Sequence, residues 1–432
     1  MPAATLDDVA FEHLLSKVSR KQLLSIVDSA RCKHALWYGS VSAGKTVASA
    51  IAFLFAVRRA PHKGLIIVVG KTIATIYANL FTLLQDRDIF GDRIASQVVY
   101  TPGATSASIF GREVLLIGAN DRKSVGNIQG KTVALAYVDE ATLLPEEFWN
   151  MLMTRLRVPG ARLLATMNPA SVNHYINKKW ILKADELDLI PFHFTMADNP
   201  TLEPSYVAMQ ERAYAGVFYD RMIKGLWTNA AGAVYPMWDP AKHVLDWERL
   251  PKFRRIIGTG IDFGTSNASA GLMLGLTAED KPRLVLLDEW RYDPSDHHDV
   301  RLAPSEQAQR FKTWLGGSHA PQPNLPDVEY NVIDPAAAHF AEELQKAGIY
   351  TWAGDNDVLG GISTISRLLQ SDQFYTTTRT PGWNAEVTEY QWDPKATEDG
   401  VDQPIKTDDH SLDAGRYITH TARGTYEYEL AA

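Results

Sequence analysis

The chain has 432 residues, of which 45% are hydrophobic and 22% are charged, as in an ordinary globular protein with room for two or three domains. A single cysteine, Cys32, excludes a disulfide framework and a cysteine-based metal site, and suits a reducing cytosol. No apolar stretch reaches membrane length and residues 1–12 are acidic, so we expect neither a transmembrane span nor a secretory signal.

The net charge of −8 is unevenly distributed along the chain. Residues 1–255 contain 30 Lys and Arg against 23 Asp and Glu, whereas residues 256–432 contain 13 against 28. A basic first part suits a polyanionic partner. The excess of Asp and Glu in residues 256–432 indicates either a solvated acidic surface or a cluster of carboxylates that binds divalent cations. We therefore expect the two parts to have different functions.

Residues 1–30 are predicted to form helix, because apolar residues recur on one face. That face begins with Phe11, Leu14, Leu15 and Val18. Within the same segment, Gln22 lies about where ATPases of the kind described next often place a glutamine that reads adenine.

A phosphate-binding loop follows the apolar run 35–38 without a mismatch to the pattern G-x-x-x-x-G-K-S/T. Its residues are Gly39, Ser40, Val41, Ser42, Ala43, Gly44, Lys45 and Thr46. The glycines let successive N–H groups point at phosphates, Lys45 reaches the β and γ phosphates, and the Thr46 hydroxyl holds Mg²⁺. The alternative is a glycine-rich turn before an unrelated helix, and the apolar helical run 47–57 argues against it.

A second motif consists of Asp139 and Glu140, which directly follow the apolar run 132–138. Asp139 is predicted to bind Mg²⁺ through water, and Glu140 to polarise the attacking water. Taken alone, such a pair is more often a turn or a helix cap. Together with the loop it indicates ATP hydrolysis, because a protein that only binds nucleotide does not need the second acid.

A third motif lies in residues 162–169, where a short strand ends in polar residues. Thr166 and Asn168 are candidates for sensing the γ-phosphate, and the alternative is a plain strand followed by an Asn-Pro turn. Apolar strands alternate with helical segments throughout this part of the chain, which predicts an α/β sheet with nucleotide at its carboxyl edge. The predicted strands are 65–69, 114–117, 133–138, 163–166 and 189–194.

Residues 200–227 are predicted to be helical again, and turn formers and aromatic residues then mark a linker at 228–255. The segment 379–407, which contains several Pro, Asp and Thr, is predicted to be a mobile loop.

The second part contains acids at the ends of predicted strands. A strand from 256 ends at Asp262, and a hairpin partner spans 270–276. A third strand, 284–287, is expected to end at Asp288 and Glu289, and another stops at Asp334.

Near residue 410 a predicted helix places His410, Asp413 and Tyr417 on one face. Each acid alone is more often a turn or cap residue. Asp262, Asp334 and Asp413 at matching element ends of an acidic domain instead indicate a two-metal phosphodiesterase, whose carboxylates must converge from separate elements.

With these motifs the chain resembles the large terminase subunit of tailed double-stranded DNA bacteriophages over nearly its whole length. Further stretches similar to that family are Asp198-Asn199-Pro200, Gly225-Leu226-Trp227, Val234-Tyr235-Pro236, Asp262-Phe263-Gly264, and Asp409-His410 leading to Asp413-Ala414. The resemblance implies an α/β protein with a P-loop ATPase domain of the additional-strand type at 1–227, the linker at 228–255, and an RNase H-like nuclease domain at 256–432.

The resemblance also implies a packaging motor that hydrolyses ATP to move double-stranded DNA into a procapsid and cuts concatemeric DNA. Implied partners are the phage portal protein, the small terminase subunit and further copies in a homo-oligomeric ring, a pentamer, on the portal. The implied location is the cytoplasm of the infected bacterial host, with no membrane. ATP and Mg²⁺ serve the ATPase, and two Mg²⁺ or Mn²⁺ ions serve the nuclease.

Carried over by position, the resemblance gives Lys45 and Thr46 phosphate and metal binding, Asp139 metal binding and Glu140 the catalytic carboxylate. Thr166 and Asn168 look like the coupling motif. The nuclease ligands would be Asp262, Asp334 and Asp413, with His410 near them and Glu289 as a possible further ligand.

The chain departs from many relatives in having small residues where they carry an arginine in the phosphate loop, and Gln129 and Gly130 where some place one before the acidic pair. Candidates for an arginine that acts in trans are Arg122, Arg155 and Arg157. One rival interpretation is a helicase or translocase with a passive second domain. Another is an actin-like ATPase with a phosphate turn at 262–265, which needs later glycine-rich turns that only Gly360-Gly361 approaches.

Overall fold

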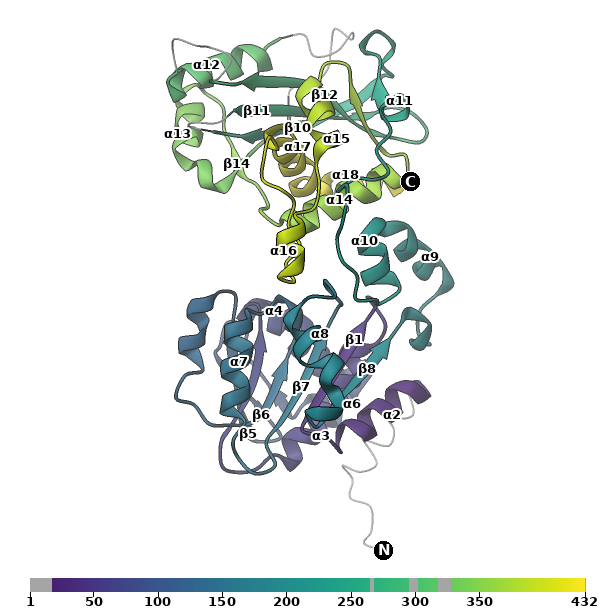
Figure 1. Ribbon diagram of the computed structural model, residues 1–432, viewed down its shortest axis with the longest axis vertical. Coiled ribbons are helices and arrows are strands. Elements are labelled where there is room, and N and C mark those ends of the chain that lie inside the picture. The colour runs from purple at the N-terminus through teal and green to yellow at the C-terminus, as the bar shows by residue number, and fades with distance from the viewer. Residues whose placement is uncertain (1–17, 265–267, 295–301, 318–327, 432) are drawn as a thin grey trace, which may run out of the picture. The chain divides into compact units, whose positions relative to one another are not determined.

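A computed structural model describes residues 18–264, 268–294, 302–317 and 328–431. The chain divides into two compact units (Figure 1). The first comprises residues 1–211, 217–229 and 398–401, and the second comprises 212–216, 230–397 and 402–432. The domain limits and the linker at 228–255 that we expect from the sequence stay a prediction. In the described parts of the chain, no helix has the length and apolar character needed to cross a bilayer.

The first unit is built on an eight-stranded sheet with the order β3-β4-β5-β2-β6-β7-β1-β8. Its strands are β1 (His34–Gly39), β2 (Leu65–Gly70), β3 (Val98–Val99), β4 (Ser106–Ile109), β5 (Arg112–Gly118), β6 (Val133–Val138), β7 (Arg162–Met167) and β8 (Leu189–Phe194). β4 pairs antiparallel with both β3 and β5, and the other pairings are parallel. All five strands predicted from the sequence are confirmed, and the short strands β3 and β4 were not predicted.

β7 lies between β1, which precedes the phosphate loop, and β6, which precedes the acidic pair. This inserted strand defines the additional-strand type of P-loop ATPase, so the predicted fold class is confirmed. The parallel register pairs Tyr38 with Met167 and Val138 with Ala165. The residues that follow these strands therefore meet at one carboxyl edge of the sheet.

Helices cover both faces of this sheet, and further short helices follow its last strand. They are α2 (Arg20–Ser29), α3 (Lys45–Arg59), α4 (Ile73–Ile76), α5 (Thr82–Leu84), α6 (Arg87–Ala95), α7 (Glu146–Arg155), α8 (Tyr175–Lys179), α9 (Pro204–Ala213) and α10 (Gly216–Phe218), with π-helical turns η1 (Tyr77–Phe81) and η6 (Tyr219–Ile223). Alternate residues of β6 belong to different cores: Leu135 packs in the cluster that contains α3, and Ala136 in the cluster that contains α7. Burial on both faces explains why these strands are continuous apolar runs.

The N-terminal prediction is confirmed only in part. The described helix α2 begins at Arg20, because Ser19 and Gln22 form a reciprocal capping box that starts a new helix. A helix running unbroken through Ser19 is therefore wrong. Phe11, Leu14 and Leu15 lie outside the described residues.

The second unit is built on a seven-stranded sheet with the order β14-β13-β10-β11-β12-β15-β9. Its strands are β9 (Val244–Leu245), β10 (Phe253–Asp262), β11 (Ser269–Thr277), β12 (Leu284–Tyr292), β13 (Tyr330–Ile333), β14 (Trp352–Ala353) and β15 (Phe374–Thr377). β10, β11 and β12 form an antiparallel meander, and β13 joins β10 in parallel, with β14 beyond it. This arrangement is RNase H-like, as predicted.

The helices of this unit are α11 (Pro240–His243), α12 (Pro304–Leu315), α13 (Ala338–Lys346), α14 (Val358–Gln370), α15 (Pro381–Glu389), α16 (Pro394–Glu398), α17 (His410–Thr421) and α18 (Arg423–Ala431). The mobile loop predicted at 379–407 is wrong, because α15 and α16 occupy much of it. Trp383 and Val387 on α15 are buried, so tertiary packing overrides the turn-forming composition.

The predicted end of β12 is also wrong. The strand continues to Tyr292, so Asp288 and Glu289 lie inside it. These polar residues are held by partners from neighbouring elements and do not mark a strand end.

Candidate active sites

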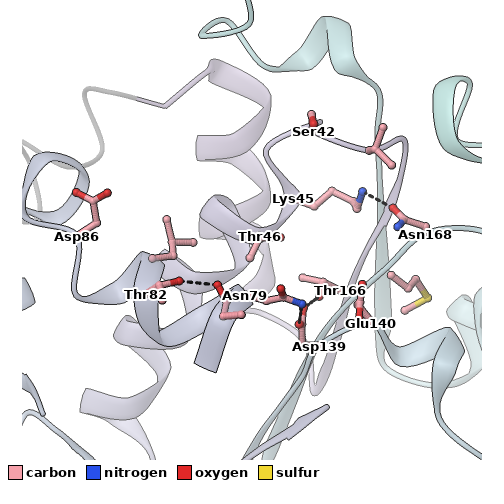
Figure 2. A pocket seen from close by; sticks show the side chains of 14 residues that line it. Ser42, Lys45, Thr46, Asn79, Thr82, Asp86, Asp139, Glu140, Thr166 and Asn168 are labelled. Carbon is pink, nitrogen blue, oxygen red and sulfur yellow. Dashed lines mark hydrogen bonds between the residues drawn. The ribbon is translucent and has the colours of Figure 1, made fainter. Parts of the chain in front are cut away.

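The phosphate loop connects β1 to α3 and faces a pocket of about 540 Å³ (Figure 2). Lys45 is the first residue of α3, whose N-cap makes no side-chain hydrogen bond, so the loop N–H groups remain available to an anion. The Lys45 ammonium donates to Asn168 Oδ1 (2.9 Å), to Gly39 O (3.1 Å) and to Ser40 O. Burial lowers the Lys45 pKa to about 8, against the opposing charge of Asp139.

Asp139 follows β6 and is held on both oxygens. Thr166 Oγ1 donates to Oδ1 and Asn79 Nδ2 donates to Oδ2, each at 2.8 Å. Burial raises the Asp139 pKa, and these two hydrogen bonds act in the opposite direction. The two donors thereby fix the orientation of the carboxylate and favour its charged form, as a metal-holding group requires.

Glu140 adopts a left-handed backbone conformation, with φ of 51°. Such a conformation is strained for a non-glycine residue and is concentrated at functional sites. Burial raises the Glu140 pKa, and the adjacent Asp139 charge raises it further. A carboxylate of raised pKa that lines the pocket suits a group that accepts a proton from water.

The pocket brings together most of the predicted nucleotide-site residues. Those on its lining are Val41, Ser42, Lys45, Thr46, Asp139, Glu140, Thr166 and Asn168. Gly39, Ser40, Ala43 and Gly44 complete the loop behind this lining. Gln22 donates to Gly44 O (3.3 Å) and accepts from Ser19 N (2.8 Å), so it supports the loop and caps α2 in the structure as it stands.

Asn79, Thr82 and Asp86 also line the pocket and were missed from the sequence. They come from the helical segment after β2, in which the π-helical turn η1 presents Asn79 to Asp139. π-helical turns are rare and often mark functional sites, but no residue pattern in 73–86 announces one.

The stretch Asp198-Asn199-Pro200 contacts the phosphate loop. Asn199 Nδ2 donates to Ser42 O (2.8 Å), and Asp198 pairs with Lys21 of α2 (2.7 Å). Tyr206 of α9 bonds through its hydroxyl to Ser42 Oγ (2.7 Å). These contacts hold the outer side of the loop in place.

The three candidate arginines lie off the pocket lining. Arg122 pairs with Glu147 (3.1 Å), Arg157 donates to Thr132 (2.7 Å), and Arg155 donates to its neighbour Thr154 (3.0 Å). None of them contacts the Lys45 pocket within this copy of the chain.

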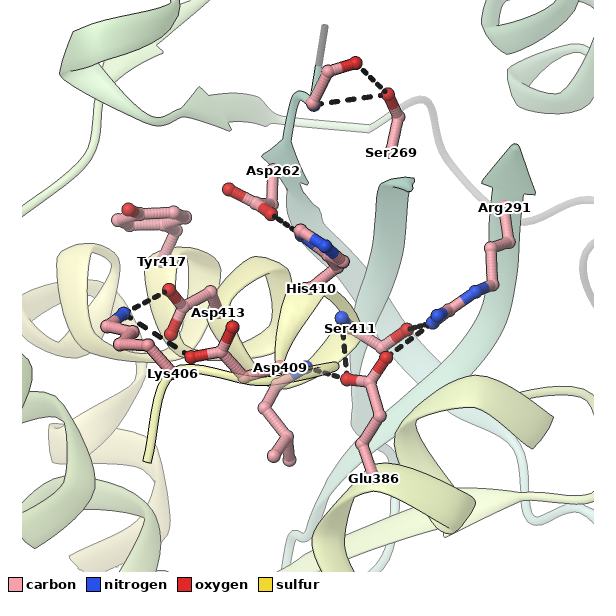
Figure 3. Close-up of polar contacts among 12 residues, drawn as sticks. Asp262, Ser269, Arg291, Glu386, Lys406, Asp409, His410, Ser411, Asp413 and Tyr417 are labelled. Carbon is pink, nitrogen blue, oxygen red and sulfur yellow. Dashed lines mark hydrogen bonds and ion pairs between the residues drawn. The ribbon is translucent and has the colours of Figure 1, made fainter. Parts of the chain in front are cut away.

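The second group of predicted residues lies at the end of β10 in the other unit (Figure 3). Ile261 of β10 pairs in parallel register with Ile333 of β13, and the Asp334 N–H donates to Ile261 O (3.1 Å). Asp262 and Asp334 therefore leave the sheet side by side, as the matching strand ends predicted.

Helix α17 brings the third acid to this edge. It packs directly on β10 at Gly260, where an added Cβ would lie 1.8 Å from Ala414 O. His410 Nδ1 donates to Asp262 Oδ2 (2.8 Å), and this bond raises the His410 pKa. Burial raises the Asp262 pKa, with further contributions from the charges of Asp413 and Asp334.

Asp413 is paired with two basic side chains, one on each carboxylate oxygen. Arg416 Nη2 donates to Oδ1 (2.9 Å) and Lys406 Nζ donates to Oδ2 (3.1 Å). Lys406 also lies 3.3 Å from Asp409 Oδ2, a buried oxygen that makes no hydrogen bond. Carboxylate oxygens are the ligands that Mg²⁺ and Mn²⁺ prefer, so the three aspartates are of the right chemical type to bind divalent cations.

As the side chains stand, no three carboxylate, imidazole or thiol groups within the described ranges are arranged to hold a metal ion. Asp334 Oδ1 accepts the Ala336 N–H (2.9 Å), and Lys406 occupies one oxygen of Asp413. Binding of a cation by all three aspartates therefore requires side-chain rearrangement, including displacement of Lys406. Their assignment as ligands stays a prediction.

Glu289 lies elsewhere than the sequence suggested. Its carboxylate accepts from Gly382 N (2.7 Å) and Ser411 Oγ (2.5 Å), on the side of α17 that meets α15. These bonds direct it into a polar cluster with Arg291 and Glu386. We therefore do not place Glu289 among the groups around Asp262.

Comparisons with known proteins agree with this geometry. Residues 31–219 match a family described as phage terminase large subunit. The large terminase from a thermophilic bacteriophage is 28% identical, with 94% of this chain and 98% of that chain covered and a TM-score of 0.82. The same terminase in complex with ADP matches at 28% identity, 93% and 99% coverage and a TM-score of 0.81.

In complex with ATP-γ-S, the terminase from this thermophilic phage matches at 28% identity, with 94% of this chain and 99% of that chain covered and a TM-score of 0.79. No curated protein matches the chain. The family match covers the nucleotide pocket, and the structural matches extend over both units. The chain is similar to phage large terminase subunits, over residues 31–219 in the family match and over both units in the solved structures, which gives it the fold of an ATPase domain followed by a nuclease domain.

Proposed function

We propose that this chain is a viral DNA-packaging motor that hydrolyses ATP to move double-stranded DNA into a procapsid and cuts concatemeric DNA by two-metal phosphodiester hydrolysis. The observation that carries the ATPase is the pocket in which Lys45, Asp139 and Glu140 meet at one edge of the sheet. The observation that carries the nuclease is the position of Asp262 and Asp334 at adjacent parallel strand ends, to which α17, packed on β10 at Gly260, brings Asp413.

In the ATPase, Lys45 binds the β and γ phosphates, and Glu140 accepts a proton from the attacking water. Thr46 and Asp139 would hold Mg²⁺, which supplies charge neutralisation at the phosphates. Asn168, just after β7, accepts from Lys45, and Thr166 of β7 donates to Asp139. Both residues thus contact groups that would bind the phosphates and Mg²⁺, so they suit the coupling of hydrolysis to movement. The complexes of the thermophilic-phage terminase with ADP and ATP-γ-S support nucleotide binding here.

In the nuclease, Asp262, Asp334 and Asp413 would hold two Mg²⁺ or Mn²⁺ ions, which supply an activated water and stabilise the leaving oxygen. His410 orients Asp262 through its Nδ1–H. Lys406 pairs with Asp413 and would have to leave its Oδ2 for a cation to bind there. The similarity to phage large terminases supports DNA, the portal protein, the small terminase subunit and a homo-oligomeric ring as partners. It also supports a location in the cytoplasm of the infected bacterial host, docked transiently on the procapsid portal.

DNase protection tests the motor function. Parent chain, small subunit, procapsids with portal and linear DNA are incubated with ATP, and the DNA that survives DNase is measured. We expect ATP-dependent protection with the parent and none with Glu140→Gln. Protection that is equal without ATP, or equal in Glu140→Gln, would contradict the proposed motor. The helicase-like rival instead predicts ATPase without metal-dependent cutting of DNA.

A further inference from the structure

Helix α17 carries two groups of the nuclease site in its first turn, yet its own N-cap is incomplete. Asp409 precedes the helix and makes no capping hydrogen bond with its side chain. The first N–H groups of a helix lack partners within the helix and must be satisfied from outside it. His410 and Asp413 thus stand on a turn whose position depends on an external acceptor.

Glu386 of α15 is that acceptor. Its Oε2 accepts the N–H of Ser411 (2.8 Å) and the N–H of Leu412 (3.0 Å), which lie between His410 and Asp413 in the chain. The side chain is 5% exposed, and its other oxygen, Oε1, is paired with Arg291 at 2.5 Å. Figure 3 shows Glu386 reaching the start of α17 from below, with Arg291 from the strand on its other side.

The cluster is tied together through the Ser411 side chain. Ser411 Oγ accepts from Arg291 Nη1 (2.6 Å) and donates to Glu289 Oε1 (2.5 Å). Glu289 in turn accepts the Gly382 N–H, and a Cβ at Gly382 would lie 2.3 Å from Glu289. α15, β12 and α17 are therefore interlocked at this point without room for a side chain at Gly382.

We propose that Glu386, clamped by Arg291, is a positioning residue for the nuclease: it fixes the first turn of α17 and thereby sets His410 and Asp413 relative to Asp262. The inference rests on the proposed nuclease function. Charge-assisted hydrogen bonds from a carboxylate to backbone N–H groups are stronger than neutral ones and hold their geometry. Outer groups that orient metal ligands typically change metal affinity or activity by roughly 10–100-fold when removed.

Mn²⁺ binding to the full-length, nucleotide-free chain tests this proposal by titration calorimetry. The Asp262→Asn variant supplies the background from any other Mn²⁺ site. The binding of interest is the part that Asp262→Asn abolishes. We expect Glu386→Ala to weaken this part by about tenfold or more. The matched control is Glu389→Ala on the same helix, where the side chain is exposed, and it should bind like the parent.

Hydrogen exchange provides a readout that needs no metal. Peptides covering residues 409–414 should exchange faster in Glu386→Ala than in Glu389→Ala, because the Ser411 and Leu412 amides lose their acceptor. Glu386→Gln keeps an acceptor oxygen but loses the charge paired with Arg291, so it should show smaller changes in both measurements. If Glu386→Ala does not fold, Glu386→Gln is compared with the control Glu389→Ala in its place.

Unchanged Mn²⁺ affinity in a folded Glu386 variant would overturn the proposal, even if exchange became faster, because the contact would then serve stability only. The proposed nuclease function itself would fail on a different result, namely that the parent chain and Asp262→Asn bind Mn²⁺ equally. The two failures are distinguishable, because the second appears in the parent before Glu386 is changed.

Discussion

Removal of the Asn79 amide should selectively impair the use of Mg²⁺ by the ATPase. Asn79 Nδ2 donates to Asp139 Oδ2 at 2.8 Å, and it is one of the two side-chain donors that hold this carboxylate, which is 4% exposed. A hydrogen bond to a charged group contributes roughly 1.5–3 kcal/mol. Since about 1.4 kcal/mol corresponds to a factor of ten, Asn79→Ala should raise the Mg²⁺ concentration for half-maximal hydrolysis by roughly 10–100-fold.

The effect should also depend on pH in a defined direction. Burial already raises the Asp139 pKa, and the Asn79 bond lowers it, so Asn79→Ala raises it further. A protonated Asp139 cannot hold Mg²⁺, and the defect should therefore be largest at low pH and shrink as pH rises.

Steady-state ATPase measured against Mg²⁺ at several pH values is the assay. Gln85→Ala is the matched control, because its amide donates to Val98 O (3.2 Å) and does not line the pocket. A melting curve for each variant checks folding. An Asn79→Ala enzyme with the Mg²⁺ dependence of Gln85→Ala at every pH would refute the reasoning.

Three further predictions follow from the two sites. Because the Lys45 pKa is lowered to about 8 and phosphate binding favours the ammonium, affinity for ADP should fall as pH rises above about 8; a dissociation constant that is equal at pH 7 and pH 9, measured with fluorescent ADP, would contradict this. Glu140→Gln should bind ATP like the parent but lose turnover by roughly 10²-fold or more, since a general base contributes roughly 10²–10⁴-fold; unchanged single-turnover hydrolysis would remove Glu140 from the mechanism. His410→Ala should reduce Mn²⁺-dependent cleavage less than Asp413→Asn does, because the imidazole orients Asp262 whereas Asp413 supplies charge; equal losses in a plasmid assay would make His410 a ligand.

Much of the fold, and the grouping of the candidate residues at two sheet edges, could be predicted because the signals are local in the sequence. The phosphate loop and Asp139 each follow a continuous apolar run, Asp262 and Asp334 each follow a short strand-like segment, and a strand end in an α/β sheet identifies the functional edge. Because paired parallel strands end at the same edge of the sheet, residues far apart in the chain lie next to one another there.

The remaining features depend on tertiary contacts that leave no periodic pattern. Asn79, which donates to Asp139, lies in the π-helical turn η1, and no residue pattern predicts such a turn. Glu289 looked like a strand-end ligand because it follows Asp288, but β12 continues and Arg291 lies two residues on, on the same face. Glu289 and Arg291 both bond to residues of α15, a helix whose segment is rich in turn formers and was therefore predicted to be a loop.

The most direct test of the account is a crossed measurement of two activities in one set of preparations. ATPase with Mg²⁺ and plasmid cleavage with Mn²⁺ are assayed for the parent, Glu140→Gln and Asp262→Asn. We predict that Glu140→Gln loses hydrolysis and retains cleavage, whereas Asp262→Asn retains hydrolysis and fails to cut at any ATP concentration. Cleavage by Asp262→Asn at the parental rate would contradict the account and favour a translocase without a nuclease.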